Sequence, residues 1–176
     1  SITQISMTIK TVAKYLEQLC REHSLVNHSD DAPHFVNLND DKRNTALADE
    51  LLYPAVYFES TDFQLTASST SVSRIYTCHL EVFTHVADTG DYAEVEQALS
   101  LTAQIITDIF VRMMHDRAAR KPENKWLLFL ELDAPVKVLP LQNEQNALYG
   151  CMAEFQVPLP DCITNSLNNF KQIEHG

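Results

Sequence analysis

Residues 91–115 read DYAEVEQALSLTAQIITDIFVRMMH, and this stretch decides the fold. Asp91 stands three residues before Glu94, an Asp version of the capping box that begins many helices. From Tyr92 to about His115, apolar side chains recur at three- and four-residue intervals along one helical face. A helix of this length would be about 35 Å long, enough to cross a whole sheet. The stripe consists of Val95, Ala98, Leu99, Thr102, Ile105, Ile106, Ile109, Phe110 and Met113.

The segment before this helix, SVSRIYTCHLEVFTHV (residues 71–86), alternates as a long strand does. Upstream, PAVYFES (54–60) predicts a second strand. We interpret the polar stretch between them, TDFQLTASSTS (61–71), as a long hairpin loop. The more apolar side of the long strand is expected to face the core, and it consists of Tyr76, Cys78, Leu80, Val82, Thr84 and Val86.

Two further strands are expected after the helix. WLLFLELD (126–133) has apolar residues on both faces, which predicts a central or covered strand. PVKVLPL (135–141) either extends that strand after a bend or pairs as a separate short strand. The last strand covers residues 148–159 and turns one side to the core: Cys151, Ala153, Phe155 and Val157.

One glycine lies near the start of this last strand, and two prolines lie at its end. Gly150 indicates a bulge or a close backbone approach at its start. Pro158 and Pro160 cannot donate to a ladder, so we expect strand pairing to stop there.

The N-terminal part of the chain begins with a helix, in which Ile9, Val12, Leu16, Leu19 and Cys20 share one face. FVNL (35–38) predicts a short strand, and TALADELL (45–52) a helical turn or two. The whole pattern predicts an α+β fold. Its four-stranded mixed or antiparallel sheet carries the N-terminal helix and one long helix, in the order α-β-β-α-β-β. We expect a single domain over residues 1–162, and a C-terminal tail, residues 163–176, that is disordered or a short helix.

Composition narrows the classes of function. The chain has 176 residues, which fits one domain. Its 3 glycines are too few for a Gly-rich phosphate loop. A net charge of −11 argues against sequence-independent binding of nucleic acid, although it allows an acidic channel through which DNA slides, and we expect no specific nucleic-acid binding. No apolar run approaches the roughly 20 residues that span a bilayer, so we expect no membrane partner.

Three side chains of the long strand were weighed as a metal site: His79, Glu81 and His85 share one face. His79-x-Glu81 matches the opening of a zinc deaminase motif, but the P-C-x-x-C that completes the motif is absent. His79 and His85 would lie about 20 Å apart along one strand, too far to share an ion. We therefore expect a solvated sheet face here.

We interpret the cysteines as packing residues and the loop aspartates as turn-forming or helix-capping residues. Cys78 and Cys151 are expected on core faces, where a thiol acts as a small hydrophobe. The loop aspartates, such as Asp40 and Asp41, lack the alternating ligands and the glycine of a calcium loop. With no C-x-x-C pair and no signal peptide, reduced thiols in a cytosolic compartment are expected. We predict no catalytic residue, no metal site and no cofactor, and hence no enzyme.

Three stretches of the sequence resemble parts of a known family: YPAVYFES (53–60), the segment 75–110 and the ending LYGCMAEFQVPLPDC (148–162). Their order resembles the tail terminator and head–tail joining proteins of long-tailed, lambda-like phages. The ending is similar to members from prophages of Bacteroides-type bacteria. The likeness covers roughly residues 5–162 as a pattern of elements. Residues 28–50 and the C-terminal tail have no counterpart in it.

The resemblance implies a homo-oligomeric ring, usually a hexamer, that caps the tail tube and meets the head connector. It implies a virion protein, made in the host bacterial cytoplasm, without catalysis or cofactor. The open edges of a four-stranded sheet agree with self-association, because edges must be paired, covered or blunted. Two alternatives stay open: a small cytosolic enzyme or ligand-binding domain, and another neck or tail-tube component.

Overall fold

A five-stranded sheet forms the frame of the protein in the computed structural model, which describes residues 7–40, 50–69, 71–131 and 135–161. The strand order is β1-β2-β3-β5-β4, with β1 parallel to β2 and the other neighbours antiparallel. The α+β class is confirmed, whereas the prediction of four strands was wrong. The strands are β1 (Phe35–Asn37), β2 (Ala55–Ala67), β3 (Val72–His85), β4 (Lys137–Asn143) and β5 (Leu148–Asp161).

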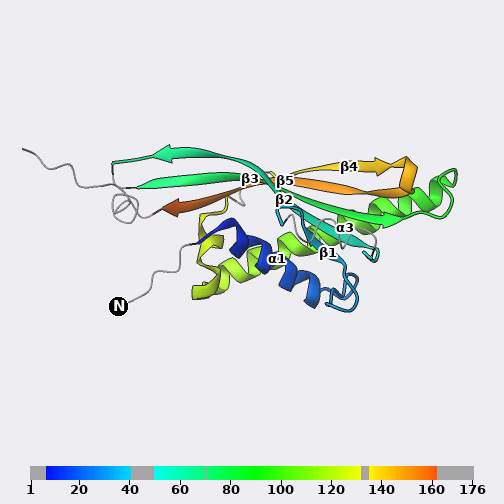
Figure 1. Ribbon diagram of the computed structural model, residues 1–176, viewed down its shortest axis with the longest axis horizontal. Coiled ribbons are helices and arrows are strands. Elements are labelled where there is room, and N and C mark those ends of the chain that lie inside the picture. Colours follow the sequence, from blue (N-terminus) through cyan, green and yellow to red (C-terminus); the bar gives the residue numbers. More distant parts are fainter. Residues whose placement is uncertain (1–6, 41–49, 70, 132–134, 162–176) are drawn as a thin grey trace, which may run out of the picture.

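Two α-helices lie on the same side of the sheet, α1 (Ile9–Glu22) and α3 (Tyr92–Ala119) (Figure 1). The long-helix prediction is confirmed, and its cap is Asp91, whose carboxylate accepts hydrogen bonds from the N–H groups of Ala93 and Glu94. Glu94 does not reach back to Asp91. Its carboxylate accepts from the N–H groups of Ala87 and Asp88 instead, and so fastens the connection between β3 and α3.

The core lies between this helical layer and the sheet. Cys78, Leu80 and Val82 of β3 and Val86 just after it are buried, as the alternation predicts, whereas Tyr76 and Thr84 of the same side are only partly buried. The predicted side of β5 is also buried, and α3 covers it with the apolar stripe that begins at Ala98. The largest fully buried side chains include Trp126, Phe58, Leu16, Leu80, Ile105, Ile106, Ile109 and Met113.

Residues 126–131, the described part of the stretch WLLFLELD, are not a strand, which corrects the prediction of a strand there. Residues Pro122–Phe129 form η1, a 3-10 helix, and Pro122 stands in its first turn. Proline favours that position, because its missing N–H would have no partner there. A short apolar run does not distinguish a strand from a buried helical turn. Here the turn buries the consecutive residues Trp126 and Leu127 completely. Of PVKVLPL (135–141), residues 137–141 belong to the separate strand β4, which is followed by a second 3-10 turn, η2 (Glu144–Asn146).

The polar stretch 61–71 is mostly strand rather than loop. β2 continues to Ala67, after a bulge between Ser60 and Asp62, and stays paired with β3 throughout. The turn is short, and the N–H of Ser68 donates to the carbonyl of Ser71 at 2.8 Å. This part of β2 is exposed at every residue, which is why its composition resembled a loop. Together with the paired ends of β3 and β5 it forms an arm that projects past the helices (Figure 1).

Strand pairing also continues through both prolines of β5, against prediction. Pro158 lies opposite Ile75 and Pro160 opposite Ser73. β4 covers β5 only over residues 148–154, so the remainder of β5 is a sheet edge. Proline is tolerated on an edge strand when its nitrogen faces away from the neighbouring strand.

Gly150 makes the close backbone approach that its position in β5 predicted. A Cβ atom at Gly150 would overlap the backbone carbonyl group of Val82 in β3. The predicted N-terminal helix and the short strand at FVNL are also confirmed, as α1 and β1. The helical turn expected at 45–52, Cys162 and the tail 163–176 fall wholly or largely outside the described residues.

Candidate functional site

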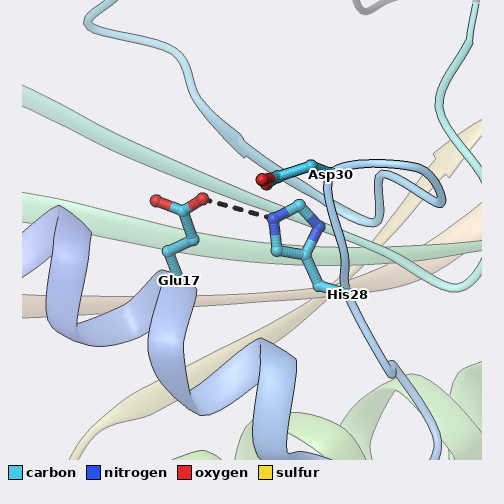
Figure 2. Close-up of side chains that lie close together, drawn as sticks. All are labelled: Glu17, His28 and Asp30. Carbon is cyan, nitrogen blue, oxygen red and sulfur yellow. Dashed lines mark hydrogen bonds and ion pairs between the residues drawn. The ribbon is translucent and has the colours of Figure 1, made fainter.

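A buried histidine between two carboxylates is the one candidate metal cluster that the described residues contain. Glu17 of α1, His28 and Asp30 bring one ligand atom each to within 4.8 Å of one another (Figure 2). His28 Nε2 lies 3.3 Å from Glu17 Oε1, and His28 Nδ1 accepts a hydrogen bond from the N–H of His34. Because Nδ1 is an acceptor, the ring proton sits on Nε2 and points at Glu17. Burial also lowers the pKa of His28, which favours this neutral form.

Arg21 already provides the positive charge of this cluster. Its guanidinium lies 2.6 Å from Asp30 Oδ1 and 3.1 Å from Glu17 Oε1. A metal ion would have to compete with that guanidinium and remove the proton from His28 Nε2. The arrangement therefore fastens the loop after α1 to the helix rather than forming an open ligand set. The only sequence signal for it was the i,i+4 spacing of Glu17 and Arg21, since His28 arrives through the loop.

A second polar cluster joins the two helices. Tyr15 of α1 donates a hydrogen bond of 2.8 Å to Asp116 of α3, and Arg112 bridges Asp116 to Glu22 of α1. Burial opposes ionisation of Asp116, but hydrogen bonds from Tyr15, Arg112 and His115 outweigh it and lower its pKa. Burial and the bond to Asp116 raise the pKa of Tyr15. Both perturbed groups thus have partners within the fold, as structural ion pairs do.

A hollow of about 330 Å³ opens beside this cluster. Its lining includes Lys14, Tyr15, Asp116, Lys121 and Trp126. Trp126 is fully buried and stacks edge-on against Tyr15. Its indole Nε1 is the buried side-chain polar atom, among the described residues, that lacks a hydrogen-bond partner. The hollow is thus the place where a small molecule would be sought.

The sheet face opposite the helices carries the three residues weighed as a metal site. His79, Glu81 and His85 do share one face of β3, but His79 pairs with Glu154 of β5 at 3.0 Å. Glu81 lies on this face with Glu59, and burial together with that neighbouring carboxylate raises its pKa. His85 is exposed near the end of the strand. The structure therefore places one histidine–carboxylate pair, His79 and Glu154, and two neighbouring carboxylates, Glu59 and Glu81, on this face.

Both cysteines that were assigned to the core are buried. Burial raises the pKa of Cys78 to about 12, which leaves its thiol protonated at neutral pH. The Cys151 thiol lies 3.7 Å from the carbonyl of Leu99 in α3 and 3.6 Å from the hydroxyl of Thr102. A nucleophile must be a thiolate, and access to it must be open. These contacts identify both thiols as packing groups.

The outer edges of the sheet are the most exposed part of the described fold. β1 covers β2 only at Val56, Tyr57 and Phe58. The side-chain amide of Asn39 then bonds both backbone polar groups of Ser60, at 2.7 and 2.8 Å, and ends the ladder. From residue 61 onward no described strand pairs with that side of β2. The outer side of β4 is equally uncovered within the described residues.

Apolar side chains stand beside both uncovered edges. On β2, Phe63 is 50% exposed and Leu65 is 65% exposed. On β4, Val138 is 42% exposed. Exposed edge strands with apolar side chains favour association with another strand. The sequence predicted association through the sheet edge, the long loops or both. Phe63 and Leu65 lie in the stretch interpreted as such a loop, which is a strand here, whereas Val138 had no signal of its own.

Comparison with known proteins adds no relative. The chain matches no protein-family model, and no curated protein resembles it in sequence. Among the described helices, none is long and apolar enough to cross a membrane.

Proposed function

We propose that this protein is a structural subunit of a phage or prophage virion, which assembles with copies of itself into a ring. The ring would resemble those of tail terminator or head–tail joining proteins. It would cap the tail tube and meet the head connector, as a hexamer or a related closed ring. The protein would act in the virion, after assembly in the bacterial host cytoplasm. It would work by contact between surfaces rather than by catalysis.

One observation carries this proposal: the sheet has two exposed edges that bear apolar side chains, at residues 61–67 of β2 and along β4. Soluble monomers usually blunt such edges with bulges, prolines or inward-pointing charges. Here the bulge lies at the start of the free β2 segment and Pro140 lies in β4, yet the apolar side chains beside both edges stay exposed. A head-to-tail contact between two different surfaces forms a closed ring when its rotation closes. The free edge of β2 and the outer edge of β4 are two different surfaces on one subunit, as a head-to-tail contact requires.

Two further features support the proposal. The polar clusters around Asp116 and His28 are engaged in holding the helices and loop in place, so neither offers an acid–base pair poised for chemistry. The described residues also contain the N-terminal helix, the long hairpin and the capped long helix on which the resemblance rests, although the sheet has five strands in an order that differs from the expected one.

The experiment is mass measurement together with electron microscopy of the purified protein, alone and with isolated tail tubes. We expect rings in solution or at one end of the tube. The main rival within the same class, a tail-tube or neck component, would instead produce stacked rings or a ring bound to the head connector alone.

A second candidate, a small-molecule-binding domain, rests on the hollow beside Trp126. Tyr15, Lys121 and Trp126 are among the residues that line it. Trp126 is the sole tryptophan of the chain, so its fluorescence reports on this place alone. Titration of a metabolite library that leaves this emission unchanged would reject the candidate, whereas a saturable shift would favour it over the ring.

A further inference from the structure

We propose that the free edge of β2 in one copy, residues 61–67, pairs with the outer edge of β4 in the next copy, so that the sheet continues from subunit to subunit. This inference rests on the proposed ring, and it names the contact that builds it. The partner is a second copy of this chain, joined through backbone hydrogen bonds between two different edges.

The two edges match in length and exposure. The last seven residues of β2 are all exposed, and β4 has seven residues, of which only Leu141 is partly covered. Seven residues of strand span about 23 Å. An added strand of that length satisfies the row of unpaired N–H and C=O groups on both edges. Pro140 withholds one donor from β4, and the other residues of the strand keep theirs.

Strand direction favours the same pairing. β2, β3, β5 and β4 alternate in direction, because each neighbouring pair is antiparallel. β4 therefore runs opposite to β2. If two copies continue one sheet with the same face toward their helices, β4 of one copy meets β2 of the other as an antiparallel neighbour. Antiparallel pairing is the slightly more stable arrangement per residue.

Side chains of like character then share a face. Phe63 and Leu65 lie opposite Tyr76 and Arg74 of β3, in rows that lead to the buried residues Val157 and Leu159 of β5. They therefore stand on the face that carries the helices. Val138 lies opposite the buried Ala153 and belongs to the same face. A continuous sheet brings these apolar side chains of two copies together.

Charge is complementary on the opposite face. Asp62 lies in the row of Thr77 and Gln156, and Lys137 lies opposite Glu154. Both rows belong to the uncovered face, because Glu154 and Gln156 alternate with buried neighbours. Asp62 is the acidic residue of the free β2 segment, and Lys137 is the basic residue of β4. The shared face thus brings opposite charges to the same side of the contact.

The other edges of the described sheet are poorer partners. β1 has three residues. The uncovered part of β5 carries Pro158 and Pro160, which lack the N–H groups that an incoming strand would need. The edges of β2 and β4 are therefore the two that remain open to strand addition.

The positions of the two edges also suit a ring. The rows of paired residues that start at β4 run through β5 and β3 and reach β2 at residues 55–59. The free segment of β2 begins after residue 59, so it lies further along the strand direction than β4 does. Each step from copy to copy therefore shifts the sheet along its strands. A sheet closes on itself only when its strands tilt and its register shifts by a fixed amount per step.

Cysteine crosslinking tests the contact in the full chain, carrying Cys162→Ser because the cysteines at 20, 78 and 151 are buried. Leu65→Cys and Val138→Cys are introduced together, and the protein is oxidised with copper phenanthroline, with and without tail tubes. Within one copy these positions are separated by β3 and β5, about 14 Å or more apart. A disulfide needs Cα atoms within about 7 Å, so only neighbouring copies can form it.

We expect a non-reducing gel to show a ladder of multiples of the 20.0 kDa chain. Mixing the two single variants should stop the ladder at the dimer, because each copy then carries one reactive edge. Val111→Cys with Val138→Cys is the matched control, since Val111 is 59% exposed on α3, away from the proposed contact. That control should give no ladder.

Three results would overturn the inference. One is a dimer of the Leu65→Cys single variant alone, which would indicate symmetric β2–β2 pairing. Another is an assembled ring, by mass, in which the double variant does not crosslink, and in that case the proposed ring itself survives. The third is a monomer under all conditions, which would reject both the contact and the ring.

Discussion

The hydroxyl of Tyr15 in α1 donates a 2.8 Å hydrogen bond to Asp116 in α3, across 101 residues of sequence. Asp116 is almost fully buried, with an 8% exposed side chain, and Arg112 and His115 are its other partners. The bond fixes how the first helix lies against the long one. The stability of the helical layer therefore depends on a polar contact as well as on apolar packing.

Removal of this hydroxyl should destabilise the fold. Tyr15→Phe leaves the buried carboxylate of Asp116 with one donor fewer, and we expect the free energy of unfolding to fall by about 2 kcal/mol. Urea denaturation followed by circular dichroism measures it. Tyr92→Phe is the matched control, because Tyr92 is 88% exposed and its loss of a hydroxyl should have little effect. Equal stability of wild type and Tyr15→Phe would show that the bond contributes nothing.

The close approach at Gly150 should tolerate no side chain. Gly150→Ala places a Cβ atom against the backbone carbonyl of Val82, where only a shift of the β3–β5 pair can relieve the overlap. We expect a loss of about 3 kcal/mol or more in the free energy of unfolding. Gly90→Ala serves as the control, since its nearest neighbour is the flexible side chain of Asp88 at 3.2 Å. A wild-type melting curve for Gly150→Ala would contradict the described register.

Protonation of His28 should weaken the fold at mildly acidic pH. Burial holds its pKa below the value near 6.5 of the unfolded chain, so the unfolded chain binds more protons as pH falls below 6.5. The stability is complete above that pH and is lost as pH approaches the lower, folded pKa. The slope can reach about 1.4 kcal/mol per pH unit for one proton.

The pH dependence is measured as the difference between wild type and His28→Gln from pH 7.5 to 5. The variant should lack this component of the loss, because its amide does not titrate in that range. His85→Gln controls for general histidine titration, since His85 is exposed. Parallel profiles of wild type and His28→Gln would show that His28 is not held neutral by the fold.

The N-cap of the long helix should contribute measurably as well. Asp91→Ala removes the acceptor of two backbone N–H groups, and we expect a loss of about 1 kcal/mol in the free energy of unfolding. Asp91→Asn should retain most of the stability, because its amide oxygen can still accept. Equal losses in both variants would attribute the effect to charge rather than to the hydrogen bond.

Periodicity predicted the parts of the fold whose residues alternate between core and solvent. α3, α1, β3 and the buried side of β5 follow that alternation, and each is where the pattern placed it. Two segments did not. The run at Trp126 is apolar on all sides, which suits a buried 3-10 turn as well as a strand. The second half of β2 is exposed on both faces, so burial leaves no trace in its sequence.

The candidate sites were less predictable than the fold. The Tyr15–Asp116 bond joins residues whose spacing in sequence carries no signal, and the His28 cluster is signalled only by the i,i+4 spacing of Glu17 and Arg21. The faces of His79, Glu81 and His85 followed from alternation, but the partner of His79, Glu154, depends on the neighbouring strand. The two open edges could be recognised only once the strand order was known, because the order decides which strands lie outermost.

Self-assembly is the central claim, and the mass of the wild-type protein in the presence of tail tubes tests it most directly. Light scattering of the protein alone and negative-stain imaging of the tubes together supply that measurement. The account predicts a closed ring, a whole multiple of the 20.0 kDa chain, free or seated at one end of the tube. A protein that remains a 20.0 kDa monomer in solution and leaves both tube ends bare would contradict it.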